Sequence, residues 1–210
     1  ETRPDFCGTN EINTMLSFGG TRCELGVQTL SNRIYKKIER GHSVQDVVDA
    51  TRLLKDSAFK VTYHLMPGLP GSSLAQDIKT LRKTFSNPLF KPDAIKLYPC
   101  LVMPNTKLFE SWKKGEFSPM SEKQALKLVL KLKSFIPRWV RIMRIQRDIP
   151  GNLVAAGITT TNLRQIALQE AEKHGVKCKC IRCREVGLKS RETKIPPLDD
   201  ARVFVETYKA

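Results

Sequence analysis

The sequence has 210 residues, of which 36 are Lys or Arg and 21 are Asp or Glu, so its formal net charge is +15. At this length, with 40% hydrophobic residues, the chain can form one large globular domain. No apolar run reaches the roughly 20 residues of a membrane span, and no secretion signal stands at Glu1, which predicts a cytoplasmic protein without membrane contact. The positive charge favours nucleic acid as the partner over a basic surface with no specific ligand.

Residues 59–71, FKVTYHLMPGLPG, are typical of a β-strand that runs into a Gly/Pro loop before a helix. Alternate residues of a strand point to opposite faces, so the apolar series that starts at Phe59 forms one face, while His64 and Met66 lie on a mixed face. The same division recurs in three other expected strands, residues 21–30, 93–99 and 139–148. In the last of these, strict alternation places Ile142, Arg144, Gln146 and Asp148 on one face, which becomes polar toward the carboxyl end.

Helices are expected between and around these strands, because apolar residues recur at helical spacing behind Ser or Thr residues suited to N-capping. The expected helices are residues 10–18, 31–40, 43–57, 72–85, 106–114, 121–135 and 161–173. Strands that alternate with helices in this way predict an α/β fold with right-handed crossovers and a parallel sheet. Residues 201–208 alternate like one further strand whose sheet lies elsewhere.

The mixed strand faces decide between the possible parallel sheets. The strands of a doubly wound sheet are covered on both sides and should be apolar almost throughout, as should the lumen of a closed barrel. Here one face of each strand is hydrophilic, with Glu24, Gln28, His64, Lys96, Tyr98, Arg144 and Gln146. We therefore expect an open, curved parallel sheet with a polar concave side. No G-x-G-x-x-G motif opens a helix after a strand, which disfavours a dinucleotide fold.

Six cysteines are too few for a disulfide scaffold at this size, and three of them form the C-x-C-x-x-C pattern of Cys178, Cys180 and Cys183. Three thiolates at this spacing can converge on one ion, and tetrahedral zinc with a structural role is the expected occupant. The fourth ligand is not evident: His174, Cys100 and a residue outside this chain are the candidates. A cluster of reduced free thiols is the alternative.

Eight motifs in order resemble the catalytic subunit of Elongator, of the archaeal or bacterial type, a radical S-adenosylmethionine (SAM) enzyme that modifies wobble uridines in tRNA. They are ETRPD at Glu1, CELGVQ at Cys23, RGHSV at Arg40, YHLMPGLPG at Tyr63, KPDAIKLYP at Lys91, RIQRDIP at Arg144, NLR at Asn162 and CREVG at Cys183. Together they extend over about residues 1–187. The resemblance implies an incomplete parallel (βα) barrel of the radical SAM type, whose lumen holds a 4Fe-4S cluster and SAM, followed by an acetyltransferase-like domain.

The resemblance also implies parts that this sequence lacks. The family's cluster motif of three closely spaced cysteines is expected upstream of Glu1, which disfavours an iron-sulfur cluster at the C-x-C-x-x-C motif, and the acetyltransferase domain is expected after Tyr208. We accordingly divide the chain into residues 1–157, the C-terminal part of the barrel; 158–187, a helix with the Cys-rich zinc segment; and 188–210, a linker and first strand toward the next domain. As a fragment it is expected to be inactive.

The reaction implied by the resemblance starts from acetyl-CoA. A 5'-deoxyadenosyl radical takes hydrogen from the acetyl methyl group, and the product adds at C5 of uridine to give 5-carboxymethyluridine. Accessory subunits of the Elongator type, or further copies of the chain, are the other expected partners. Two alternatives stay open: a non-catalytic tRNA-binding scaffold, and a radical SAM enzyme with a different substrate.

Candidate site residues follow from the hydrophilic faces and the matched motifs together. Residues expected to contact SAM are Glu1, Arg3, Gln28, Met66 and Gly68. For Arg3 an ion pair with a carboxylate that holds the rim together is the alternative. Residues expected near the reacting groups are His64, Lys96 and Tyr98. For His64 a structural role is the alternative, and for Lys96 a plain salt bridge to Glu24. Residues expected to contact tRNA are Arg141, Arg144 and Arg147.

Overall fold

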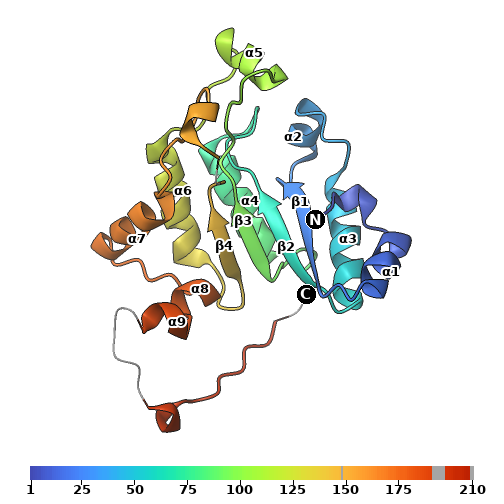
Figure 1. The fold of residues 1–210 in the computed structure, drawn as a ribbon, viewed down its shortest axis with the longest axis vertical. Coiled ribbons are helices and arrows are strands. Elements are labelled where there is room, and N and C mark those ends of the chain that lie inside the picture. The colour runs from blue at the N-terminus through green and yellow to red at the C-terminus, as the bar shows by residue number, and fades with distance from the viewer. Residues whose placement is uncertain (148, 191–196, 209–210) are drawn as a thin grey trace.

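The computed structural model describes residues 1–147, 149–190 and 197–208, and a four-stranded parallel sheet forms its centre (Figure 1). The strands lie side by side in chain order, as β1 (Arg22–Gln28), β2 (Lys60–Leu65), β3 (Ala94–Leu97) and β4 (Arg141–Ile145). Every neighbouring pair is parallel, because helical connections carry the chain back before each new strand. The predicted open parallel sheet is confirmed.

Nine α-helices lie in the described part of the chain: α1 (Thr9–Ser17), α2 (Asn32–Lys37), α3 (Val44–Asp56), α4 (Leu74–Ser86), α5 (Lys107–Lys113), α6 (Glu122–Phe135), α7 (Leu163–Lys173), α8 (Ile181–Arg184) and α9 (Val186–Lys189). Three short 3₁₀ helices accompany them, η1 (Pro4–Phe6), η2 (Gly151–Leu153) and η3 (Leu198–Asp200). Five hydroxyl residues accept a hydrogen bond from the N–H of the third residue of their helix, namely Ser31, Ser43, Ser73, Thr106 and Ser121. The helix expected from Thr161 instead begins after Asn162, without a side-chain cap. Helices α8 and α9 were not predicted, because four residues are too few to show a helical period.

The apolar faces of the strands pack on helices that cover one side of the sheet. In Figure 1, α3, α4 and α6 lie behind the strands. Fully buried side chains of the strands, such as Val61 and Ile95, share one core with Leu54 of α3 and Leu128 of α6. The side of the sheet toward the viewer has no helix in front of it. The alternation read from the sequence therefore separates a helix-covered face from an open one.

The face assignment of β4 needs a correction. A β-bulge lies between Ile142 and Arg144, so Ile142 pairs with Ile95 while Arg144 pairs with Lys96. Because paired residues of neighbouring strands point the same way, Ile142 faces the helices and Arg144 faces the open side. Strict alternation had placed both on one face. The prediction for Asp148 lies outside the described residues.

Neither end of the chain forms a regular strand among the described residues. Near Glu1 only Thr2 pairs with β1, through a parallel bridge to Leu25, and the chain then turns into η1. Residues 201–208 pair with no strand among the described residues, and their role as the first strand of a further domain stays a prediction. They run extended, with Phe204 78% exposed, and Tyr208 stacks on Trp139 with the ring centroids 4.3 Å apart.

Helices in the described ranges are all too short or too polar to cross a membrane.

Leu128 tests the packing of α6 against the sheet. Its side chain is fully buried, so Leu128→Ala should lower the free energy of unfolding by about 2–5 kcal/mol. The control is Leu168→Ala on α7, where the leucine is 43% exposed and a change within about 0.5 kcal/mol is expected. Denaturant unfolding measures both, and equal losses would contradict the assigned core.

Candidate functional site

Glu24 is the hub of the polar contacts on the open face of the sheet. Its side chain comes from β1 and meets His64 of β2 and Lys96 of β3, which are paired neighbours in the sheet. One carboxylate oxygen of Glu24 lies 2.6 Å from His64 Nε2 and also accepts a hydrogen bond from Lys96 Nζ. Glu1 reaches the other ring nitrogen, with 3.1 Å between its carboxylate and His64 Nδ1. The salt bridge considered as the alternative role for Lys96 is thus present.

This arrangement keeps Glu24 ionised. Partial burial alone would raise the pKa of its carboxyl group, yet hydrogen bonds from Lys96 and His64, together with the charges of both groups, outweigh burial and lower the pKa. His64 is only 3% exposed, and both of its ring nitrogens face carboxylates. A buried histidine held in this way has a fixed orientation, which a site residue and a structural residue both require.

Two further predicted residues lie next to the hub. The ring of Tyr98 meets the His64 ring edge-on, with centroids 5.5 Å apart, and the guanidinium of Arg147 lies 5.1 Å from the centre of the Tyr98 ring. Arg144 pairs in register with Lys96 and is exposed on the same face. Arg141 is engaged elsewhere, in a 2.6 Å ion pair with Glu185 at the start of β4.

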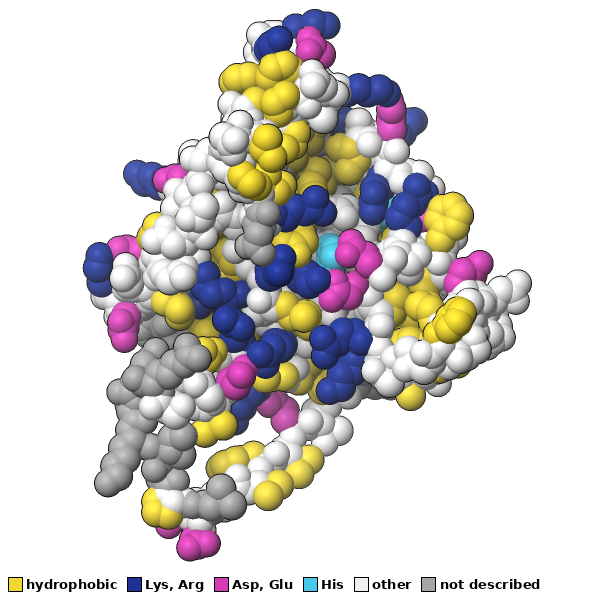
Figure 2. Space-filling view, viewed as in Figure 1, with side chains coloured by type: hydrophobic (Ala, Val, Ile, Leu, Met, Phe, Trp, Pro, Cys, Tyr) yellow, Lys and Arg dark blue, Asp and Glu magenta, His cyan; other side chains and the backbone are white. Residues whose placement is uncertain are grey.

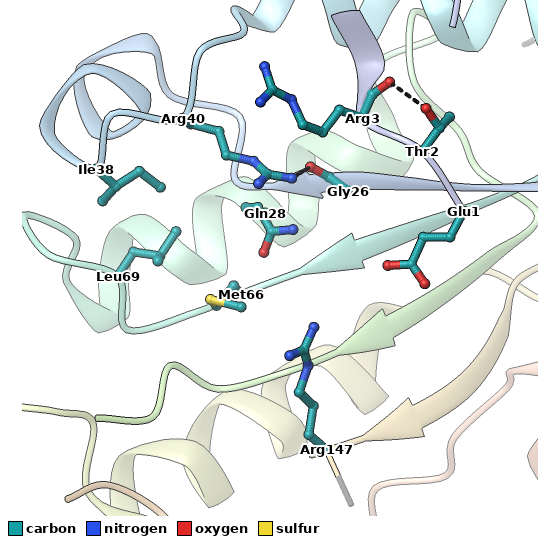
Figure 3. A pocket seen from close by; sticks show the side chains of 10 residues that line it. All are labelled: Glu1, Thr2, Arg3, Gly26, Gln28, Ile38, Arg40, Met66, Leu69 and Arg147. Carbon is teal, nitrogen blue, oxygen red and sulfur yellow. Dashed lines mark hydrogen bonds between the residues drawn. The ribbon is translucent and has the colours of Figure 1, made fainter. Parts of the chain in front are cut away.

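A cavity of about 570 Å³ opens at the carboxyl ends of the strands (Figure 3). Its lining contains five of the predicted site residues, Glu1, Arg3, Gln28, Met66 and Arg147, together with Thr2, Gly26, Ile38, Arg40 and Leu69. Figure 3 shows Gln28 and Met66 on one side of the hollow and Glu1 and Arg147 around it. The carboxyl ends of parallel strands are where α/β folds bind ligands.

Arg3 and Arg40 form the basic part of the rim. Arg3 donates to both carboxylate oxygens of Asp5, so the ion pair considered for it is present. Arg40 donates to the Gly26 carbonyl at 2.9 Å, and a Cβ atom on Gly26 would lie only 2.6 Å from its guanidinium. Arg40 was not predicted to line the site, because it fell at the end of the expected helix 31–40, whereas α2 ends at Lys37 and Arg40 projects from the loop that follows. The signal available was its place in the matched motif RGHSV, beside the Gly26 of CELGVQ.

Asp77 of α4 anchors the loop after β2 through its carboxylate. This carboxylate accepts hydrogen bonds from Gly68 N–H at 2.8 Å and from the Ser72 hydroxyl at 2.6 Å. Burial raises the pKa of Asp77 despite these two contacts. Gly68 itself does not line the cavity: its φ is +79°, and a Cβ atom there would lie 3.1 Å from Met120. Its contact with SAM stays a prediction.

Basic side chains surround the hub on the open face. Figure 2 shows Lys and Arg side chains gathered around a histidine and acidic side chains near the middle of this side of the molecule. A basic surface with a recessed centre is suited to a polyanion that presents one group to a cavity.

The three cysteines of the C-x-C-x-x-C motif converge at the start of β4. Their Sγ atoms lie within 4.8 Å of one another, and Cys180 is fully buried. The next residue, Ile181, donates its N–H to the Val140 carbonyl, which attaches this segment to the edge of the sheet. Hydrogen bonds from the other two thiols lower the pKa of Cys180. A thiolate among neighbouring thiols is a ready metal ligand.

Neither internal candidate for a fourth ligand belongs to this group. His174 is exposed, and its Nδ1 lies 2.8 Å from the carbonyl of Glu170. Cys100 packs in a separate cluster with Ile34 and Leu69. No other His, Cys, Asp or Glu of the described residues joins the three sulfur atoms.

Comparison with known proteins shows which proteins the chain resembles. The Radical SAM superfamily model matches residues 1–84, and the Radical_SAM C-terminal domain model matches residues 92–173. The chain is 50% identical over its whole length to the "tRNA uridine(34) acetyltransferase" of Methanocaldococcus jannaschii, and 42% identical over 94% of its length to human "Elongator complex protein 3". The chain resembles the Elongator protein 3 family of radical SAM proteins over almost its whole length. It spans only 39% and 36% of those two relatives.

A solved structure agrees with this family. The Elongator protein 3 of Methanocaldococcus infernus, with a deletion at its N-terminus, superposes with a TM-score of 0.95 at 49% sequence identity. The match covers 99% of this chain and 49% of that one. The predicted incomplete barrel of the radical SAM type is therefore confirmed.

Radical SAM proteins use SAM together with a 4Fe-4S cluster, and the two groups fit the described residues differently. The cavity offers the amide of Gln28, charged groups at its rim and the apolar side chains of Met66 and Leu69, which suits a nucleoside that carries a charged amino-acid tail. Among the described residues, no group of three cysteines lines the cavity. The cysteine group lies at the start of β4, away from the carboxyl ends of the strands where the cavity opens.

The pH dependence of the stability of a Glu24→Gln variant tests the contacts of Glu24 with His64 and Lys96. Because the pKa of Glu24 is lowered in the folded state, its ionised form contributes stability that is present above the unfolded pKa of about 4.3 and is lost as pH falls through the folded pKa. The variant should lose roughly 1–3 kcal/mol of unfolding free energy at pH 7, and the difference should shrink below pH ~4. Thermal unfolding against pH measures this, with the exposed Glu110→Gln as control. A difference independent of pH would contradict the hub.

Proposed function

We propose that this chain is the radical SAM and tRNA-binding core of an enzyme that converts wobble uridine of tRNA to 5-carboxymethyluridine, with acetyl-CoA as the carbon donor. The observation that supports it most is the cavity at the carboxyl ends of the strands, next to a buried polar hub and a basic surface. The full-length relatives named as tRNA uridine(34) acetyltransferases make tRNA the substrate to test. Accessory subunits or further copies of the chain, and a cytoplasmic location, stay predictions.

SAM, when bound and reduced, supplies a 5'-deoxyadenosyl radical that can take hydrogen from a methyl group. In the proposal, the residues of this chain orient the cofactor in the cavity. Gln28 both donates and accepts hydrogen bonds through its amide, and Met66 and Leu69 offer an apolar surface to the adenine. Glu1 and Arg40 face the charged end of SAM, an amine and a carboxylate. These assignments rest on the lining of the cavity.

His64, Lys96 and Tyr98 lie where they can orient the reacting groups. Lys96 is held by Glu24, and 17% of its side chain is exposed toward the open face, so its ammonium can still meet an anionic group of a substrate. His64 is enclosed by Glu1 and Glu24, which makes it the residue that keeps the hub in place. We assign positioning to His64, and substrate contact to Lys96 and Tyr98.

Arg144 and Arg147 are the proposed contacts to tRNA. Both follow the bulge of β4 toward its carboxyl end, and guanidinium groups match phosphates and stack on bases. Arg141 is a weaker candidate, since its ion pair with Glu185 would have to open.

For the C-terminal part we propose a structural zinc site at Cys178, Cys180 and Cys183. It would fasten residues 158–187 to the edge of β4, and residues 188–210 would lead on to the next domain. The convergence of the three sulfur atoms supports this proposal. The fourth ligand is to be sought outside the described residues.

SAM binding tests the cavity. In the full-length protein with its cluster reconstituted, Gln28→Asn should weaken SAM binding about tenfold, because the shorter amide loses one hydrogen bond while Asn tolerates the positive φ of 66° at this position. The exposed Gln169→Asn is the matched control. Equilibrium binding and 5'-deoxyadenosine release are measured. A wild-type protein that neither cleaves SAM nor modifies tRNA would defeat the proposed function.

Binding to tRNA should depend steeply on salt. The chain carries a net charge of +15, and each phosphate contact releases counterions, so affinity should fall strongly between about 50 and about 200 mM salt. Arg144→Gln should reduce the slope of log K against log salt by ~1. The control is Arg52→Gln on α3, a helix on the covered side of the sheet. An affinity that does not change with salt would count against tRNA.

Cys180→Ser tests the zinc site. The purified wild-type protein should contain about one zinc per chain, and the variant should lose it and unfold at a lower temperature, because metal-binding energy is also folding energy. Cys100→Ser, in a separate cluster, should keep the metal. Metal analysis decides the matter, and a wild-type protein without zinc would show that the three thiols are free.

A further inference from the structure

Lys133 is buried in an unusual way. It lies in the last turn of α6, and only 1% of its surface is exposed. Lysine is almost never fully buried without a partner, since its ammonium is costly to remove from water. Within the described ranges, no carboxylate forms an ion pair with it and no aromatic ring lies over it. The group that justifies the burial of this charge must therefore be of another kind.

The nearest recorded partner is a sulfur atom of the cysteine group. Lys133 Nζ lies 4.0 Å from Cys183 Sγ, the outer limit for a hydrogen bond to sulfur. Cys183 belongs to the three cysteines whose sulfur atoms converge. The buried ammonium is thus directed at the proposed metal site rather than at solvent.

The charge of a loaded site fits this placement. Three thiolates around a divalent ion carry a net charge of −1, and such a group next to an apolar core needs a cation nearby. The carbonyls at the C-terminal end of α6 offer partial compensation for a lysine, but side chains of a helix lean toward its N-terminus and away from those carbonyls. Cys183 therefore remains the better partner.

A second cation nearby is already engaged. Arg164 of α7 donates to the carbonyl of Ile142 at 3.1 Å, which ties it to β4. Burial lowers the pKa of Arg164, and the charges of Cys178, Cys180 and Cys183 act in the opposite direction, so Arg164 is a further cation near the cysteine group. Lys133 has no such backbone contact among the described residues.

We propose that Lys133 is the charge partner of the loaded cysteine site: its ammonium donates to the Cys183 thiolate and neutralises the net charge of the three-thiolate complex. This inference rests on the proposed zinc site and extends it to a residue outside the C-x-C-x-x-C motif. Lys133 acts on the metal through Cys183, so it is a positioning residue. Hydrogen bonds to ligands commonly change metal affinity by about 10–100-fold.

The test is Zn²⁺ affinity of the full-length protein, measured by competition with a chromophoric chelator. Lys133→Met removes the charge and leaves an unbranched side chain that is one atom shorter. It should weaken Zn²⁺ binding at least tenfold. Lys131→Met, at an exposed position of the same helix, is the matched control and should stay within twofold of the wild type. Lys133→Gln, which is neutral but polar, serves if the methionine variant fails to fold, and it should weaken binding as well.

Two further readouts separate charge from packing. At saturating Co²⁺ the thiolate-to-metal absorption of Lys133→Met should match that of the wild type, which shows that all three sulfur ligands still bind. The unfolding temperature of the metal-free variant should not fall below that of the wild type, because an ammonium is replaced by an apolar chain of similar size. The inference would be overturned if the metal-free Lys133→Met variant were less stable than the wild type by enough to explain its weaker Zn²⁺ binding.

The outcomes distinguish the two proposals. If the wild-type protein binds no Zn²⁺, the zinc site fails and this inference fails with it. If the wild type binds Zn²⁺ and the neutral variants at position 133 bind it equally well, the zinc site stands and the role of Lys133 is overturned.

Discussion

The open face of this sheet depends on one carboxylate shared by neighbouring strands. Glu24 holds His64 and Lys96, and each of the three would be costly to bury alone. Joined together they satisfy one another, which allows a hydrophilic layer to lie directly against a sheet whose reverse face is fully apolar. The curved sheet can therefore present charged groups to a ligand without a helix to cover them.

The cavity beyond the hub is formed by backbone that departs from regular strand geometry. Gln28 ends β1 and Gln146 directly follows β4, with φ values of 66° and 82°, a region that non-glycine residues seldom adopt. Bulges in the same two strands turn side chains toward the open face. Close approach of Arg40 to Gly26 adds a charge at the rim. Strained positions of this kind cluster at functional sites, and Gln28 lines the cavity.

Much of the fold could be predicted because its signals are local. Alternating faces located all four strands, and hydroxyl residues such as Ser43 located helix starts. The bulge of β4 could not be predicted, since one extra residue leaves the composition of a strand unchanged. Alternation in residues 201–208 did not indicate whether a partner strand was present. In the site, Arg40 was missed because it was assigned to the end of a helix that stops three residues earlier. The burial of Lys133 shows only when α6 and the cysteine segment meet in space.

A crystal structure of the full-length protein with SAM bound tests the central claim most directly. The account predicts SAM in the cavity between Gln28, Met66 and Arg147, with the Glu24, His64 and Lys96 contacts intact beside it. SAM bound away from the carboxyl ends of the strands, or a hub that comes apart when SAM is present, would contradict the account.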